Sequence, residues 1–235
     1  MFIYKIKKNG VFVVKNTIVG SIWEFFCPYY CISCGKVGGI LCSRCKKYII
    51  SGNNWKCLCC GGKLNNRICE KCKLPFCEQF YIGERSDLLK DLINCYKFQS
   101  IRACSRVFAE LLWDLFGNFL QGKIVVPLPT IKKHVRERSI DHTKRLVSDL
   151  VQMCGGESRM VISRRNNTVQ VGANMSLRKK QAEKAYMVRS DIDIDANYIL
   201  VDDIWTTGSS MTSACIELQK VGAKNISILV LAKSG

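Results

Sequence analysis

Apolar residues follow helix-like and strand-like spacing through the last two thirds of the chain. Within residues 85–98, Leu88, Leu92 and Tyr96 recur on one helix face, so a helix is predicted there. Further helices are predicted over 101–120, 140–154 and 208–221, and strands over 123–126, 160–163, 198–201 and 226–231. Because strands and helices alternate, this region is predicted to be an α/β domain with a largely parallel sheet.

The first third of the chain lacks this periodicity. Residues 27–77 contain 11 of the 15 cysteines, as expected for loops that are held by ligands rather than by a core. Residues 1–26 are apolar and basic, and their second half is compatible with a short helix that ends before Pro28. We therefore expect an N-terminal extension over 1–26, a cysteine-rich module over 27–77 and the α/β domain over 78–235.

Eight cysteines form four Cys-x2-Cys pairs, arranged as two sets in tandem. The first set is Cys31, Cys34, Cys42 and Cys45, and the second set is Cys57, Cys60, Cys69 and Cys72. Two such pairs can complete a tetrahedron of thiolates around zinc and leave no open position for water, so two structural zinc ions are predicted. Disulfides are the alternative. Cys59 competes with Cys57 and Cys60 for two ligand places. We assign Cys57 and Cys60, because their x2 spacing matches that of the other pairs.

The first residues do not resemble a secretory signal. Lys5, Lys7, Lys8 and Lys15 interrupt the apolar stretches, no cleavage site follows, and no apolar run is long enough to span a membrane. We therefore expect a cytoplasmic protein, in which cysteines are reduced or metal-bound because disulfides are rare in that compartment.

The charge balance favours polyanionic partners. The formal net charge is +17, and it stays at about +13 if eight thiolates bind two zinc ions. Residues 121–190 hold 15 Lys and Arg against 5 Asp and Glu. Nucleic acid, phosphorylated metabolites and anionic membrane surfaces are the partners that such a charge attracts.

A candidate ligand site follows the apolar strand predicted over 198–201. Asp202 and Asp203 come at the carboxyl end of this strand, and a turn leads from them into the next helix. The turn consists of Thr206, Thr207, Gly208, Ser209 and Ser210. Free N–H groups at a helix N-terminus favour phosphate, glycine allows close approach of the ligand, and the carboxylates would take ribose hydroxyls. An ordinary Thr or Ser N-cap is the alternative, but it does not explain the paired acids.

Residues 199–210 resemble the phosphoribosyl pyrophosphate loop of type I phosphoribosyltransferases, and the full layout resembles the competence-protein-F (ComF) family. The resemblance runs from about Trp23 to Leu231. It includes Cys27-Pro28, Lys97-Phe98, Val126-Pro127-Leu128-Pro129, Arg136-Glu137-Arg138, Gln170-Val171-Gly172 and Arg178. It implies a type I phosphoribosyltransferase-like parallel sheet flanked by helices and preceded by a small double zinc-ribbon module.

The resemblance also implies roles for individual residues. Asp202 and Asp203 would contact the ribose 2′- and 3′-hydroxyls, directly or through Mg²⁺, and the turn after them would hold the 5′-phosphate. The ligand would be phosphoribosyl pyrophosphate or another sugar phosphate, with Lys132 and Lys133 near the pyrophosphate. The family acts in DNA uptake during natural transformation, which implies single-stranded DNA and uptake proteins such as a helicase as partners.

Basic residues of the α/β domain form a candidate DNA-binding rim. Its members are Arg136, Arg138, Arg164, Arg165, Arg178, Lys179 and Lys180. A merely solvated surface is the alternative for a single run of charge, but several runs fall in the same predicted domain.

The chain departs from the family pattern around the predicted acceptor site. Ser139-Ile140-Asp141-His142 stands where Gly-Phe-Asn-Gln is usual, Ala173 replaces a leucine, Gln181 replaces an asparagine, and Trp205 replaces a smaller residue. Two functions stay open: an enzyme that transfers a phosphoribosyl group, and a catalytically silent adaptor that binds DNA or protein partners.

Overall fold

The computed structural model describes residues 7–8, 11–12, 29–52, 55–85, 87–98, 103–130, 141–165 and 185–234 of the chain. The short helix expected in the second half of residues 1–26 lies outside these residues, as do the segments 131–140 and 166–184. Two short strands near the N-terminus, β1 (Lys7–Lys8) and β2 (Val11–Phe12), pair antiparallel. None of the helices within the described ranges has the length and apolarity that crossing a lipid bilayer requires.

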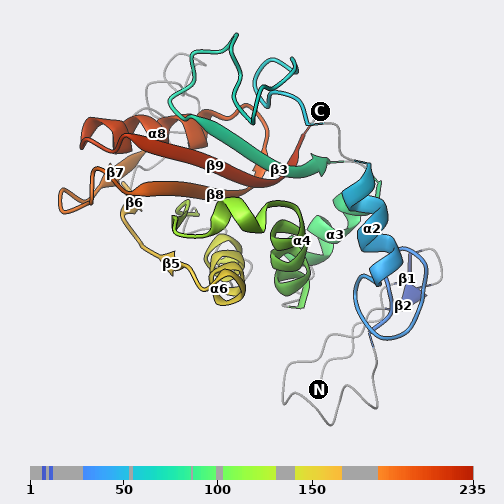
Figure 1. The fold of residues 1–235 in the computed structure, drawn as a ribbon. Helices are drawn as coiled ribbons and strands as arrows, with labels where there is room; N and C mark the ends of the chain where they lie inside the picture. The colour runs from blue at the N-terminus through green and yellow to red at the C-terminus, as the bar shows by residue number, and fades with distance from the viewer. Residues whose placement is uncertain are drawn as a thin grey trace, which may run out of the picture.

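Five parallel strands form the central sheet (Figure 1). They are β3 (Glu78–Glu84), β4 (Ile124–Pro127), β5 (Glu157–Ser158), β8 (Asn197–Trp205) and β9 (Asn225–Lys233), in the order β3-β9-β8-β4-β5. All neighbouring pairs in this order are parallel. The expected fold class is therefore confirmed: a parallel sheet flanked by helices, with the cysteine sets ahead of it in the chain.

The strands differ from the sequence pattern at several places, and the short strands β1, β2 and β5 were not predicted. β3 was not predicted, although its central residues are all buried. The strand expected over 160–163 is found as β6 (Ile162–Arg164), which pairs antiparallel with β7 (Tyr186–Val188) outside the main sheet. β8 continues beyond the apolar run, because β9 pairs with it up to Trp205. Asp202 and Asp203 consequently lie within a strand and not after one.

Helices cover both faces of the sheet (Figure 1). α3 (Asp87–Phe98), α4 (Ala103–Leu120) and α6 (His142–Cys154) pack on one face, and α8 (Ser209–Lys220) packs on the other. Ile199 and Val201 of β8 join the core of α3, α4 and α6, whereas Tyr198 and Leu200 join the core of α8. Since side chains alternate along a strand, this register directs Asp202 to the α8 side and Asp203 to the side of α3. The alternation breaks after Asp203, because Ile204 packs against the core of α3, α4 and α6 and Trp205 joins the core of α8.

The two cysteine sets pack in different cores. Cys31 and Cys45 of the first set join the core of α3 and α4, and Lys46 of α2 (Ser43–Ser51) forms an ion pair with Glu110 of α4. The segment of the second set joins the core of α8 and lies on the α8 side of the sheet (Figure 1). The boundaries 27–77 of a single module stay a prediction.

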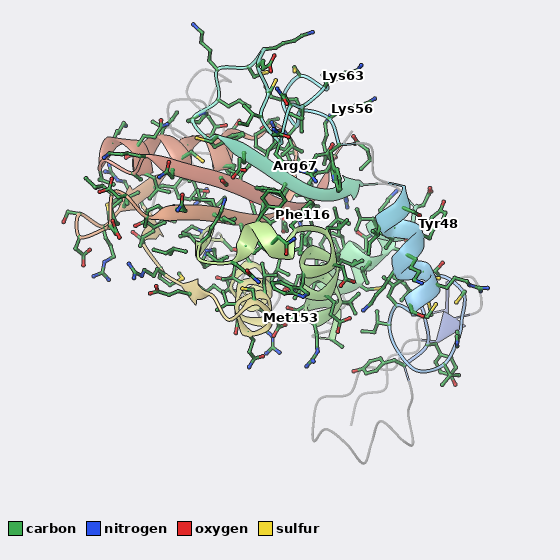
Figure 2. All side chains as sticks on the ribbon, viewed as in Figure 1. Tyr48, Lys56, Lys63, Arg67, Phe116 and Met153 are labelled. Atoms are coloured by element: carbon green, nitrogen blue, oxygen red, sulfur yellow. The ribbon has the colours of Figure 1, made fainter. Side chains whose placement is uncertain are left out.

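The segment of the second set also covers the free edge of β3. The Gln79 N–H donates to the Arg67 carbonyl (3.2 Å), and Trp55 Nε1–H donates to the Tyr81 carbonyl (2.8 Å). The Arg67 guanidinium lies 3.6 Å from the Trp55 ring centroid and 5.3 Å from that of Phe116 on α4 (Figure 2). An uncovered edge strand would invite pairing with another chain, and these contacts prevent it.

Candidate functional site

The structure gathers the cysteines into two groups of four thiols, as their spacing predicts. One group is Cys31, Cys34, Cys42 and Cys45, and the other is Cys57, Cys60, Cys69 and Cys72, with the sulfurs of each group within 4.8 Å of one another. A tetrahedral zinc with Zn–S bonds of about 2.3 Å separates its sulfurs by about 3.8 Å. The Cys34–Cys42 and Cys60–Cys69 sulfurs are 3.6 and 3.7 Å apart, so both groups fit a structural zinc ion. Cys59 is exposed and belongs to neither group.

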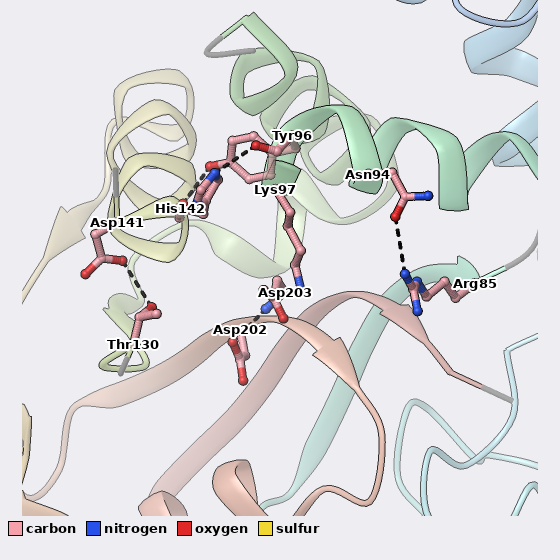
Figure 3. Close-up of polar contacts among 9 residues, drawn as sticks. All are labelled: Arg85, Asn94, Tyr96, Lys97, Thr130, Asp141, His142, Asp202 and Asp203. Atoms are coloured by element: carbon pink, nitrogen blue, oxygen red, sulfur yellow. Dashed lines mark hydrogen bonds and ion pairs between the residues drawn. The ribbon is translucent and has the colours of Figure 1, made fainter. Parts of the chain in front are cut away.

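Asp202 and Asp203 point to opposite faces of the sheet (Figure 3). Asp203 follows the alternation of Ile199 and Val201 toward α3, where its Oδ2 lies 2.5 Å from Nζ of Lys97. Asp202 points to the α8 side and lines a cavity there. The sequence predicts that both carboxylates serve one ligand, whereas in the structure Asp202 lines the ligand cavity and Asp203 pairs with Lys97.

The carboxyl group of Asp202 changes charge near neutral pH. Burial raises its pKa to about 7, and the nearby charge of Asp203 adds to this effect. Lys97 and Arg164 act in the opposite direction, as does the Asp203 N–H, which donates to Asp202 Oδ1 at 2.8 Å. A carboxyl group in this balance can either accept a hydrogen bond from a hydroxyl group or donate one to it.

The turn after β8 and Asp202 together enclose a cavity of about 60 Å³. The exposed members of the turn are Thr206, Thr207, Ser209 and Ser210. Gly208 is the N-cap of α8 with φ of 72°, and it has no side chain with which to cap the helix. Within the part of the chain that the structure describes, the Ser209 N–H donates only to the Thr207 hydroxyl, at 3.4 Å. The first N–H groups of α8 and its dipole are therefore directed at the cavity, where they favour an anion.

Trp205 forms a wall of this cavity and is only 4% exposed. Its ring lies directly against Gly208: a Cβ atom at Gly208 would be 2.1 Å from Cζ2 of the indole. The indole also meets the Phe76 ring edge-on, with centroids 6.1 Å apart and an interplanar angle of 84°. The residue that departs from the family pattern is thus a packing element of the site.

Arg164 and Arg165 are the two members of the predicted basic rim that the structure describes. The Arg164 guanidinium of β6 lies 5.5 Å from the centroid of the Tyr186 ring and donates to the Tyr186 hydroxyl at 3.4 Å. Its positive charge also lowers the pKa of Asp202, so Arg164 lies on the same side of the sheet as the cavity. Arg165 is exposed. Outside the described residues lie Lys132, Lys133, Arg136, Arg138, Arg178, Lys179 and Lys180.

Two residues near the acid pair had no assigned role in the sequence analysis. Lys97 appeared there only within a short motif, and Tyr186, which interacts with Ser210, did not appear at all. No spacing signal connects either residue to β8, because both contacts depend on the fold. A separate cavity of about 460 Å³ lies between α2, β3 and α3, and neither acid of the pair lines it.

Comparison with known proteins supports the resemblance that the motifs indicate. The chain is 24% identical over 198 residues to the competence protein ComFC of Streptococcus pneumoniae strain R6, which covers 82% of this chain and 87% of that protein. The chain is ComFC-like. Together with the two four-thiol groups, this likeness confirms the expected resemblance to the competence-protein-F family. No protein-family model matches the chain.

Among solved structures, a similar one is the allosteric regulatory enzyme of purine biosynthesis, with a TM-score of 0.41 and 11% identity. The match covers 55% of the ComFC-like chain but only 25% of that enzyme. A hypoxanthine phosphoribosyltransferase from Staphylococcus aureus has a TM-score of 0.36 and 15% identity, with 55% of this chain and 62% of that one covered. The strand order and the parallel pairing, not these weak overlaps, define the fold.

Proposed function

We propose that this protein binds a 5-phosphoribosyl group, in the form of phosphoribosyl pyrophosphate with Mg²⁺, and that it acts in the cytoplasm in DNA uptake. The observation that carries the proposal is the cavity between Asp202 and the N-terminus of α8. The place in DNA uptake is supported by the likeness to a protein named for competence.

Each side of the cavity has a separate task in this proposal. The N–H groups that follow Gly208 bind the 5′-phosphate, since they lack helical acceptors. Asp202 takes a ribose hydroxyl, and Arg164 offsets the negative charge that the ligand brings. Carboxylates are oxygen ligands of the kind that Mg²⁺ prefers, so Asp202, the acid that lines the cavity, is compatible with the ion, which would neutralise the pyrophosphate.

Removal of both carboxylates tests the site. In isothermal titration calorimetry with phosphoribosyl pyrophosphate and Mg²⁺, we expect Asp202→Ala with Asp203→Ala to weaken binding by about tenfold or more, because Asp202 lines the cavity and one charged hydrogen bond is worth roughly 1.5–3 kcal/mol. The matched control is Asp191→Ala with Asp195→Ala, which removes two exposed acids paired with Arg189 and Lys224. Equal affinity of the two double variants would contradict the site.

A pyrophosphate-release assay separates transfer from silent binding. The purified protein is given phosphoribosyl pyrophosphate with a panel of bases, amines and oligonucleotides. Release with one acceptor selects a phosphoribosyltransferase. Retained binding without release selects the adaptor, in which the fold holds the sugar phosphate and the cysteine sets hold a partner such as a helicase.

The charge of the chain supports single-stranded DNA as a further partner. If about four phosphates are contacted, we expect the affinity for an oligothymidylate to fall roughly 50-fold between 50 and 200 mM salt, because bound counterions are released. Fluorescence anisotropy of a labelled oligonucleotide measures this slope. An affinity that does not change with salt would remove the argument from charge.

A further inference from the structure

The second cysteine set and the phosphate-binding turn meet in the core under α8. Leu58, between two cysteines of the set, and Phe76, which follows the set, are 2% and 7% exposed and belong to the same core as Trp205. The edge of one ring meets the face of the other in the Phe76–Trp205 pair, an arrangement that favours contact between aromatic rings. Phe76 therefore connects the segment of the second cysteine set with Trp205, which forms the wall of the cavity.

The set is fixed to the sheet on either side of this contact. Gln79 of β3 is 1% exposed; its Oε1 accepts from the Leu58 N–H at 2.7 Å, and its Nε2 lies 3.8 Å from the sulfur of Cys57. The Cys77 N–H donates to the carbonyl of Ile226, just inside β9, at 2.8 Å. The position of Phe76 is thus determined by the set before it and by the sheet after it.

The first set has no such connection in the described residues. Cys31, Cys45 and the neighbouring Ile40 and Leu41 belong to the core of α3 and α4, and Trp205 is not a member of that core. The two sets therefore allow a comparison within one chain. Both have four thiols, but only the second set reaches the wall of the cavity, through Phe76, whereas the first set packs in the other core.

We propose that Phe76 is a positioning residue through which the second cysteine set holds Trp205, and with it the phosphate-binding turn, in place. The indole packs directly against Gly208, with no room for even one Cβ between them, so a displaced indole would leave the turn without the ring that supports it. Zinc in the second set keeps Phe76 where it is, and zinc in the first set has no effect on the cavity. This inference rests on the proposed function for the identity of the ligand.

The binding test uses ribose 5-phosphate with Mg²⁺ in calorimetry on full-length variants whose zinc content has been counted. Cys60→Ser and Cys34→Ser each remove one ligand, from the second and the first set respectively, and Cys59→Ser is the control for thiol loss outside both sets. We expect Cys60→Ser and Phe76→Ala to weaken binding about tenfold or more. Cys34→Ser and Cys59→Ser stay within about twofold of the parent.

A second readout needs no ligand. The protein is labelled with 5-fluorotryptophan, and the Trp205 resonance is assigned by its loss in Trp205→Phe. We expect this resonance to move in Cys60→Ser and in Phe76→Leu, which keeps every cysteine and most of the buried volume, but not in Cys34→Ser. If Cys60→Ser does not fold, Phe76→Leu decides both readouts, with a several-fold loss of affinity expected.

The outcomes separate this inference from the proposed function. If the parent protein binds neither ribose 5-phosphate nor phosphoribosyl pyrophosphate, the proposed function fails, and the fluorine spectra alone decide the coupling. A Trp205 resonance that moves equally in Cys34→Ser and Cys60→Ser, or in neither variant nor in Phe76→Leu, overturns the coupling. Parent binding that survives unchanged in Phe76→Ala overturns it as well.

Discussion

Gly208→Ala is expected to lower the free energy of unfolding by about 2–5 kcal/mol and to abolish ribose 5-phosphate binding. Two effects add. A residue with a Cβ atom costs roughly 1–2 kcal/mol in the left-handed region, where Gly208 has φ of 72°. The new methyl group would also lie 2.1 Å from the buried indole of Trp205, and such overpacking costs about 1–3 kcal/mol more. Denaturant unfolding measures the sum.

Gly155→Ala is the matched control for this prediction. Gly155 ends α6 with φ of 61°, but no atom lies within 4 Å of the position of its Cβ. Only the backbone effect of about 1–2 kcal/mol is expected there. In the Gly208→Ala background, Trp205→Leu should recover part of the lost stability, because it removes the clash. Equal losses in the two glycine variants would mean that the indole does not constrain the turn.

Asp202→Asn is expected to stabilise the protein at pH 8 while it weakens ligand binding. The pKa of Asp202 is raised to about 7 from 3.8, mainly by burial, so the folded protein binds a proton more tightly than the unfolded chain does. Between these two values the stability falls as pH rises, and above pH 7 the full cost is present. That cost is on the order of 4 kcal/mol at 1.36 kcal/mol for each pKa step of 1. Asparagine avoids the cost and keeps an oxygen that can accept from the Asp203 N–H.

The pH dependence distinguishes this effect from a simple packing change. We expect the gain from Asp202→Asn over the parent to be large at pH 8 and close to zero at pH 4, in urea unfolding at both values. Comparison with the parent cancels the pH dependence of the cysteine sets. The control is Asp191→Asn: Arg189 lowers the pKa of that exposed acid, so its removal should give no gain at pH 8. A gain from Asp202→Asn that is equal at both pH values would show that the carboxyl group is not buried as described.

Local sequence patterns predicted the features that depend on near neighbours. The x2 spacing of the cysteines predicted both four-thiol groups, and the apolar runs predicted α3, α4, α6 and α8 with the strands β4, β6, β8 and β9, but not α2 or the other strands. Gly208 could be recognised as a special position, because a turn between a strand and a helix often requires a positive φ.

Features that depend on distant segments could not be predicted in this way. The apolar run ends at Val201, yet hydrogen bonds from β9 extend the strand, and this extension is what turns Asp202 and Asp203 to opposite faces. Lys97 approaches Asp203 only because α3 packs on that face of the sheet. The contact between Phe76 and Trp205 likewise exists only once the second cysteine set lies on the α8 side.

The central claim is that the turn after β8 holds the phosphate of a phosphoribosyl ligand, and an amide NMR titration of the ¹⁵N-labelled protein tests it most directly. On addition of ribose 5-phosphate with Mg²⁺, the account predicts saturable shifts at Gly208, Ser209 and Ser210, with smaller shifts near Asp202. It is contradicted if these amides stay in place while signals from the larger cavity, such as those of Tyr48 and Trp55, move instead.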